Sequence, residues 1–442
     1  MKRILSLICC LSVMASAFAG CGSKPAESTS SAQAPPSSAP AESQAAPEEE
    51  APAESAAGGE ITVMVPPWAE PSQELLDSFT AESGIKVVMN IVGWDDIRNK
   101  ISIAAVGQTA PADVVEVDWS WVGEFGATGW MEPIEMTQEE KDGMPTVQSF
   151  IYGDEVLALP YANDFRLAYY NTEHFSQAGV DAAPQNWDET IAACKKIKEA
   201  GICEYPLSFT LSATEAATTS LLWMTLSKYG DFFNDDFSVN KDNVLGALTF
   251  LNSLVNEEKL IDPASQNMKD IEVYGKLTAG AASFMVGPTY FIGLINNPEE
   301  SQVVGKAAAT LVPGNGTIKT ATFALPEGVG IPKYSENKEA ARKFIDWYTS
   351  PDIQVKMYGE KGNIPTRTVA LQQLIDNGTI EGGDVLIEQS DYISAPFPGG
   401  IPEWYPEMSN TIYNSVNQMV QGALTPEQAY ENIASRVEEL RQ

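Results

Sequence analysis

The residues best suited to chemistry lie at a polar break between two apolar runs of the chain. The segment 157–171 reads as two strands, or as one strand interrupted at Asn163 and Asp164, and Arg166 follows directly. A carboxylate among apolar residues needs hydrogen-bond donors, because an unpaired buried charge is costly. Asp164 is therefore either the cap of a local turn or a group that points into a space between two lobes. Arg166 could pair with Asp164 or bind an acidic ligand.

A second group of acidic and aromatic side chains follows predicted strands nearer the N-terminus. Strands at 61–65, 85–92 and 113–117 alternate with helices, which predicts a parallel sheet covered on both faces. Ligands of such sheets bind beyond the carboxyl ends of the strands. The candidates at these ends are Trp68, Glu70, Asp118, Trp119 and Trp121.

Two alternatives stay open among these candidates. Trp119 and Trp121 are two positions apart and would not share a face of a helix, so one is expected to meet a ligand while the other packs. Asp118 could contact the ligand, or it could cap a helix with its carboxylate.

The remaining chain is predicted to be mainly helical. Helices are expected at 187–200, 213–229, 244–258, 336–348, 403–421 and 426–440, and strands at 280–286 and 323–331. The folded part, roughly 380 residues, is too large for one core and should form two lobes. Two aromatic candidates lie in its loops: Tyr290 after a Gly-Pro pair, and Trp404 in a Pro/Gly-rich stretch.

The N-terminal 20 residues have the pattern of an export signal. A basic start precedes the apolar run 4–18, which is too short to span a membrane as an anchor. The sequence Ala19-Gly20-Cys21 resembles the lipobox of bacterial lipoproteins, which implies lipidation of Cys21 and a membrane anchor; ordinary cleavage after Ala19 is the alternative. Residues 21–59 are predicted to be a disordered tether, since no large apolar side chain follows Cys21 there.

Composition and motifs exclude several classes of function. The chain carries 27 Lys and Arg against 60 Asp and Glu, a net charge of −33, whereas nucleic-acid binding needs a basic face. His174 is the only histidine, and the sequence has no P-loop, dinucleotide or zinc motif, so no metal, cofactor or catalytic residue is predicted. A glycosidase working with two carboxylates stays as a minor alternative. Cys194 and Cys203 form either a disulfide or two separately buried thiols.

Several segments, in order along the chain, resemble the extracellular solute-binding proteins of family 1, the sugar receptors of ABC importers. The segments are Pro111-Ala112-Asp113-Val114-Val115, Gly129-Trp130-Met131-Glu132-Pro133, Leu159-Pro160 with Tyr170-Asn171, Pro184 with Trp187-Asp188-Glu189, Gly280-Ala281-Ala282, and Gly362-Asn363-Ile364-Pro365. The resemblance implies an α/β, two-lobe periplasmic-binding-protein-like fold with a ligand cleft between the lobes. Its hinge would consist of chain crossovers near Asp164, Leu311 and Gly362.

The resemblance also implies a division of the chain and a set of contacts. Residues 60–164 and 311–361 would form the N-terminal lobe, and residues 165–310 and 362–442 the C-terminal lobe. Asp164 matches the position of an acidic ligand contact of the family, and Tyr290 a region where the family carries tryptophan.

The function that the resemblance implies is transport. The protein would be an exported, monomeric lipoprotein that captures a carbohydrate and delivers it to a membrane permease, and its many candidate aromatics favour an oligosaccharide. A glycerophosphodiester or peptide cargo, or a role as a sensory receptor, is the alternative.

Overall fold

Two β-sheets, each with its own helices, organise the chain. The computed structural model describes residues 59–394 and 396–442. The predicted signal peptide, nearly all of the predicted tether and the lipidation site Cys21 lie outside the described residues. No described helix combines the length and the apolar character needed to cross a bilayer.

The first sheet is mixed rather than purely parallel. Its strands are β1 (Glu60–Val65), β2 (Lys86–Ile91), β3 (Val114–Asp118), β4 (Met131–Glu132), β7 (Leu159–Ala162) and β12 (Glu327–Pro332), in the order β2-β1-β3-β12-β4 with β7 also paired to β12. The three N-terminal strands are parallel, as predicted. The prediction of an all-parallel sheet was wrong because β12, from far along the chain, pairs antiparallel with β3, β4 and β7.

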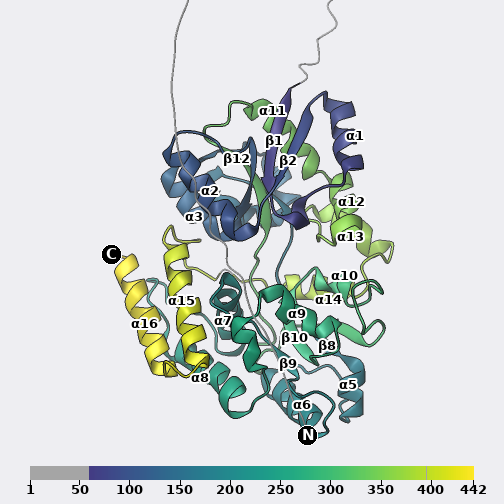
Figure 1. The fold of residues 1–442 in the computed structure, drawn as a ribbon, viewed down its shortest axis with the longest axis vertical. Coiled ribbons are helices and arrows are strands. Elements are labelled where there is room, and N and C mark those ends of the chain that lie inside the picture. Colours follow the sequence, from purple (N-terminus) through teal and green to yellow (C-terminus); the bar gives the residue numbers. More distant parts are fainter. Residues whose placement is uncertain (1–58, 395) are drawn as a thin grey trace, which may run out of the picture. The chain divides into compact units, whose positions relative to one another are not determined.

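Local sequence signals explain why helices flank this sheet. Helix α1 (Gln73–Ser83) starts where the Ser72 hydroxyl accepts the Leu75 N–H at 3.4 Å, and it ends at Gly84, whose φ of 72° suits glycine. Its apolar face includes Phe79, whose ring meets Phe344 of α11 (Lys338–Tyr348) at 5.4 Å. Figure 1 shows both helices beside the strands of the first sheet.

The second sheet is smaller and is covered mainly by helices. Its strands are β8 (Arg166–Asn171), β9 (Leu207–Ser208), β10 (Phe284–Pro288) and β11 (Ala307–Thr310), in the order β11-β8-β10-β9. The strand predicted at 280–286 starts later, at Phe284. The strand predicted at 323–331 starts only at Glu327 and belongs to the first sheet as β12.

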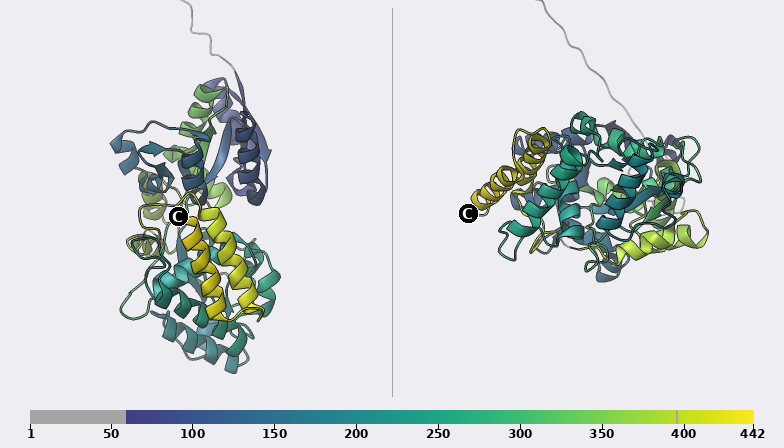
Figure 2. Two further views of the ribbon diagram at one scale, coloured as in Figure 1. Left: turned by 90° about the vertical axis from the view of Figure 1, so that its left-hand side faces the viewer. Right: turned by 90° about the horizontal axis from the view of Figure 1, so that it is seen from below.

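The helices agree with the predicted positions to within a few residues where apolar periodicity is strong. The other helices are α2 (Trp94–Val106), α3 (Val122–Thr128), α4 (Gln138–Asp142), α5 (Thr172–Gln177), α6 (Trp187–Glu199), α7 (Glu215–Lys228), α8 (Lys241–Asn252), α9 (Asp270–Thr278), α10 (Phe291–Leu294), α12 (Pro351–Lys361), α13 (Thr368–Asp376), α14 (Gly383–Ser390), α15 (Tyr405–Val420) and α16 (Pro426–Leu440). Short 3-10 turns include η1 (Pro67–Ala69) and η2 (Trp119–Trp121), and a π-helical turn, η4 (Ser253–Glu257), extends α8. Helices α15 and α16 run side by side (Figure 2) and pack on α7 and α8.

The chain passes between the sheets at the polar break seen in the sequence. The two strands predicted around Asn163 and Asp164 are confirmed as β7 and β8, and they belong to different sheets. The chain crosses again between β11 and β12. The exact lobe boundaries stay a prediction.

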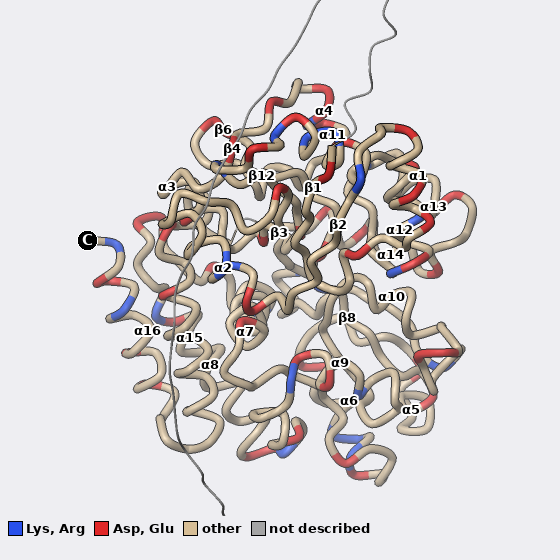
Figure 3. The backbone as a smooth tube through the Cα atoms, turned by 45° about the horizontal axis from the view of Figure 1, so that its top comes forward, with Lys and Arg blue, Asp and Glu red and all other residues tan. Residues whose placement is uncertain are grey.

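The two cysteines of the folded part are not bonded to each other. Cys194 and Cys203 are both buried free thiols in one apolar cluster, so the second of the two alternatives holds. Several acidic positions lie on α1 and on α4, two of the helices around the first sheet (Figure 3).

Candidate functional site

Asp164 and Arg166 form an ion pair at the crossover from the first sheet to the second. Arg166 donates through its guanidinium to Asp164, and their side chains are 8% and 22% exposed. Asp164 also accepts the backbone N–H of Thr289 at 3.0 Å and faces the Thr289 hydroxyl at 3.3 Å. Of the two roles predicted for Arg166, pairing with Asp164 is therefore the one the structure has. The pair joins the crossover to the end of β10.

Asn163 connects the same crossover to a later segment. Its backbone bridges Ile364, and its side-chain amide donates to the carbonyl of Pro365 at 2.8 Å. The segment after α12 is thereby held against the polar break between β7 and β8. Asn163 thus has a bonded position at the crossover between the two sheets.

Trp119 and Trp121 pack in different directions, as their spacing predicted. The ring centroids of Trp121 and Trp94 lie 5.1 Å apart, within an apolar cluster of the first sheet. The ring centroid of Trp119 instead lies 5.2 Å from that of Tyr405 and 5.7 Å from that of Phe323, in the apolar cluster of the second sheet. Trp119 therefore reaches from the end of β3 toward the other sheet. Both rings are buried, at 3% exposure each, and which of them meets a ligand stays a prediction.

Asp118 caps the turn that carries Trp119. Its carboxylate accepts the backbone N–H of Ser120 at 2.8 Å and the Ser120 hydroxyl at 2.5 Å. The side chain is buried, and this burial raises the pKa of Asp118 to about 8 despite the two hydrogen bonds. Asp118 is thus a cap, and it is also a carboxyl with a strongly perturbed pKa at the predicted end of the strand.

Glu327 is the acidic residue that the sequence did not reveal. It lies directly opposite Asp118 in the register of β3 and β12. Its carboxylate accepts the Tyr161 hydroxyl at 2.6 Å and the indole N–H of Trp68. Burial raises the pKa of Glu327 to about 7. Nothing near Glu327 in the sequence marks it, because its partners are far away along the chain.

Trp68 and Glu70 occupy the loop after β1, as predicted. Trp68 lies in η1 and is 40% exposed, while its indole N–H reaches Glu327. Glu70 follows η1 and is half-buried. Trp68 is therefore hydrogen-bonded to Glu327, the residue opposite Asp118 at the end of β3. Among the described residues, no hydrogen bond connects Glu70 to these carboxyls.

Two further glutamates lie near these groups, Glu116 fully buried and Glu215 half-buried. Glu116 is fully buried on β3, and neither of its carboxylate oxygens has a hydrogen-bond partner. Its pKa is raised by burial, then by Glu327 and Asp118. Glu215, at the start of α7, accepts hydrogen bonds from Tyr405 and from the Ser409 hydroxyl, the latter at 2.5 Å, and burial raises its pKa.

Tyr290 and Trp404 are half-buried at helix starts. The Tyr290 ring lies 4.8 Å from that of Phe291, and burial raises the pKa of its hydroxyl. The Trp404 ring contacts Phe237 at 5.8 Å. Tyr405, the next residue, is the one whose ring meets that of Trp119, and the role of Trp404 as a ligand contact stays a prediction.

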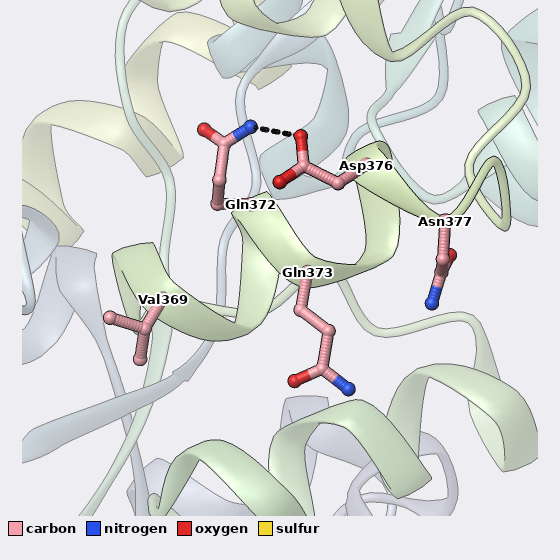
Figure 4. Close-up of a pocket in the computed structure, with 5 residues that line it drawn as sticks. All are labelled: Val369, Gln372, Gln373, Asp376 and Asn377. Atoms are coloured by element: carbon pink, nitrogen blue, oxygen red, sulfur yellow. Dashed lines mark hydrogen bonds between the residues drawn. The ribbon is translucent and has the colours of Figure 1, made fainter.

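Two surface pockets lie away from these residues. One is formed on α13 by Val369, Gln372, Gln373, Asp376 and Asn377, with Gln372 bonded to Asp376 at 2.7 Å (Figure 4). The other lies between the segments 133–141 and 154–156. Neither contains a predicted site residue. Among residues 59–394 and 396–442, no cluster of ligating side chains fits a metal ion.

Comparison with known proteins identifies the family. The profile of the bacterial extracellular solute-binding proteins matches residues 65–355, which is more than half of the chain. The chain belongs to this family. The likeness inferred from the ordered motifs is thereby confirmed, and the family is one of transport binding proteins rather than enzymes.

Relatives cover most of this solute-binding protein. A Sinorhizobium fredii protein named "Probable amino-acid ABC transporter periplasmic-binding protein y4oP" is 26% identical over 81% of this chain and 84% of its own length. The sn-glycerol-3-phosphate-binding periplasmic protein UgpB of Rhizobium meliloti is 22% identical over 71% of this chain and 75% of its own.

Solved structures share the two-lobe fold. Maltose-bound MalE3 of T. maritima matches with a TM-score of 0.76 and 25% identity, over 86% of this chain and 100% of that one. A solute-binding protein of Agrobacterium radiobacter K84 in complex with ribitol matches with a TM-score of 0.77 and 19% identity, over 87% of this chain and 99% of that one. These matches confirm the predicted fold class.

Proposed function

We propose that this solute-binding protein is the substrate receptor of an ABC importer and that its cargo is a carbohydrate. The cargo would bind where Trp119, at the end of β3, meets the aromatic side chains of the second sheet. The observation that carries the proposal is the contact between the rings of Trp119 and Tyr405, beside the carboxyl groups of Asp118 and Glu215. Sugars present apolar C–H faces and many hydroxyls, and such a set of aromatic rings and acceptors complements both.

The likeness to a maltose-bound protein supports this cargo class. MalE3 of T. maritima is similar in fold over its whole length. The number of candidate aromatics in this chain favours an oligosaccharide over a monosaccharide, because each ring can pack against an apolar sugar face. These aromatic candidates include Trp68, Trp119, Tyr290 and Trp404.

The crossover would act as the hinge of capture. Asp164, paired with Arg166 and bonded to Thr289, lies where the chain passes from one sheet to the other. A ligand that contacts both sheets favours the closed arrangement and shifts the equilibrium toward it. We infer that Asp164, Asn163 and Arg166 act by positioning the two sheets and contribute contacts at the rim of the site. Glu70 and Tyr290 would contribute further contacts to the ligand.

The remaining parts of the proposal concern location and partners. The mature protein would be a monomer, held at the outer face of the cytoplasmic membrane by a lipid on Cys21, and it would deliver its cargo to the permease of the importer. Release to a permease suits a binding protein of moderate affinity. A peptide or amino-acid cargo is the second candidate, favoured by the y4oP relative. The acidic surroundings of Trp119 argue against a phosphodiester.

A thermal-shift screen against mono-, di- and oligosaccharides, amino acids, peptides and glycerophosphodiesters tests the proposal. A ligand that binds only the folded state at 100 times its Kd stabilises it by about 2.7 kcal/mol. One sugar class should raise the Tm. A shift with amino acids or peptides alone would reject the carbohydrate cargo and keep the transport role.

A matched pair of variants connects the shift to the site. Trp68→Ala should weaken binding of the identified sugar at least tenfold by titration. Tyr334→Ala is the control, because Tyr334 is 39% exposed, close to the 40% of Trp68, and follows the far end of β12. Equal loss in both variants, or no loss in Trp68→Ala, would contradict the proposed site.

A further inference from the structure

Three carboxyl groups share one face of two adjoining strands. Asp118 and Glu327 are direct partners in the antiparallel register of β3 and β12, and Glu116 lies two residues before Asp118 on the same face of β3. Directly opposed residues of antiparallel strands have Cβ atoms roughly 5 Å apart. Glu116 and Asp118 are buried and Glu327 is half-buried. The three acids are therefore neighbours with little water around them.

No basic side chain neutralises this group. Among the ion pairs of the described residues, none includes Glu116, Asp118 or Glu327, and the buried Arg166 is paired with Asp164. The hydrogen-bond donors to Asp118 and Glu327 are neutral groups of serine, tyrosine and tryptophan. Glu215 is likewise bonded only to neutral hydroxyl groups. The groups bonded to these carboxyls are therefore all neutral, and Arg166, which lowers the pKa of Glu327, is already paired with Asp164.

Glu116 is the member of this group whose carboxylate has no hydrogen-bond partner among the described residues. It is 0% exposed, and both of its oxygens lack partners. Glu327 and Asp118, the other two acids, raise the pKa of Glu116 beyond the effect of burial, and the Tyr161 hydroxyl lowers it. A buried polar group without a partner costs several kcal/mol in apolar surroundings, so such a group is expected where a ligand completes the bonding.

The three carboxyl groups come nearest to solvent at Trp68. This indole bonds to Glu327 through its N–H, and the residue is 40% exposed. A cation can lie against the face of an indole ring. We propose that the cargo carries a protonated amine, which binds among Glu116, Asp118 and Glu327 with Trp68 against it. The inference rests on the proposed function and narrows its cargo to an amine-bearing sugar.

The raised pKa values of these acids predict that binding of an amine releases protons. Burial raises the pKa of Asp118 to about 8 and that of Glu327 to about 7, so both carboxyls hold protons at pH 6 in the free protein. A bound ammonium favours the carboxylates, and the acids then release protons on binding. Other titratable or charged groups that act on these acids come from several elements: Tyr161 of β7, Glu215 of α7, Tyr348 of α11, Tyr405 of α15, and the Asp164–Arg166 pair.

Calorimetric titration of the purified protein at pH 6 tests the inference. The probes are the β-1,4-linked glucosamine disaccharide, its neutral N-acetylated form and 1,4-diaminobutane, each in two buffers with different ionisation enthalpies. The amine disaccharide should bind at least tenfold more tightly than the acetylated form, with net proton release. Equal or tighter binding of the acetylated form would overturn the inference while keeping the carbohydrate function.

The other outcomes separate the two proposals. Binding of the diamine with no binding of either sugar would support the cationic cargo and reject the carbohydrate function. Failure of both amines to bind at millimolar concentration would overturn the inference, and binding of neutral sugars in the thermal-shift screen would then leave the carbohydrate function standing.

Charge-neutral variants identify the groups involved. Glu116→Gln and Asp118→Asn should each lower the preference for the amine over the acetylated disaccharide at least tenfold. Glu82→Gln is the control, because it removes one carboxylate from an exposed position on α1. The Tm of each variant reports whether it is folded. A folded Glu116→Gln variant that keeps the full preference would overturn the inference.

Discussion

Replacing Asp118 with asparagine should make the protein's stability less dependent on pH. Burial raises the pKa of this carboxyl from 3.8 to about 8. Between these values the unfolded chain has lost the proton while the folded chain keeps it, so the folded state binds about one proton more. The free energy of unfolding therefore falls as pH rises, by about 1.4 kcal/mol per pH unit from this group. Between pH 5 and 7 the fall amounts to about 3 kcal/mol.

The asparagine variant lacks this titration and keeps a side-chain oxygen for the backbone N–H of Ser120. Its stability should therefore rise relative to the unmodified protein from pH 5 to pH 7, by about 3 kcal/mol in the ideal case.

Urea unfolding at pH 5, 6 and 7 and constant ionic strength measures this difference. The Glu82→Gln variant, changed on an exposed helix surface, controls for the change in net charge. If Asp118→Asn and the unmodified protein gave parallel lines of unfolding free energy against pH, the burial argument for Asp118 would be refuted.

Three further changes test the packing around the site, each by urea unfolding. Trp119→Ala should cost about 3–5 kcal/mol, because the buried ring packs on Tyr405 and Phe323; a cost below about 1 kcal/mol would contradict that packing. Gly123→Ala should destabilise by about 1–3 kcal/mol, since a Cβ there would lie 2.5 Å from the carbonyl oxygen of Ile401, and an unchanged midpoint would disprove the close approach. Asp164→Asn should cost about 3 kcal/mol by leaving the buried guanidinium of Arg166 without its counter-charge. Restored stability in the double variant with Arg166→Met would support this reason, and an additive loss would not.

Much of the fold could be predicted because it depends on neighbours in the sequence. The alternation of strands and helices from 61 to 117, the end of α1 at Gly84 and the break at Asn163 all follow from local patterns. The ordered motifs also identified the family correctly. The mixed first sheet could not be predicted, since β12 pairs with β3 from more than 200 residues away and nothing local specifies that partner.

The candidate site shows the same contrast between short-range and long-range information. The types of residue at the end of β3, an acid followed by two tryptophans, marked Asp118 and Trp119 directly. The sequence also showed that the tryptophans must diverge, because positions two apart point in different directions. Which one reaches the second sheet depends on Tyr405 and Phe323, which come close only through folding. Glu327 gained its role in the same way, through the register of β12 against β3.

Residue types and local spacing thus account for the family, the crossover and the choice of Asp118 and Trp119 as candidates, because those features are set by a residue's own chemistry and its near neighbours. The ionisation of the acids is different. It depends on water being excluded and on like charges being brought together from β3, β12 and α7. Burial and mutual repulsion are properties of the assembled fold, and for this reason Glu116, fully buried and unpartnered, was invisible as a candidate until the strands were placed together.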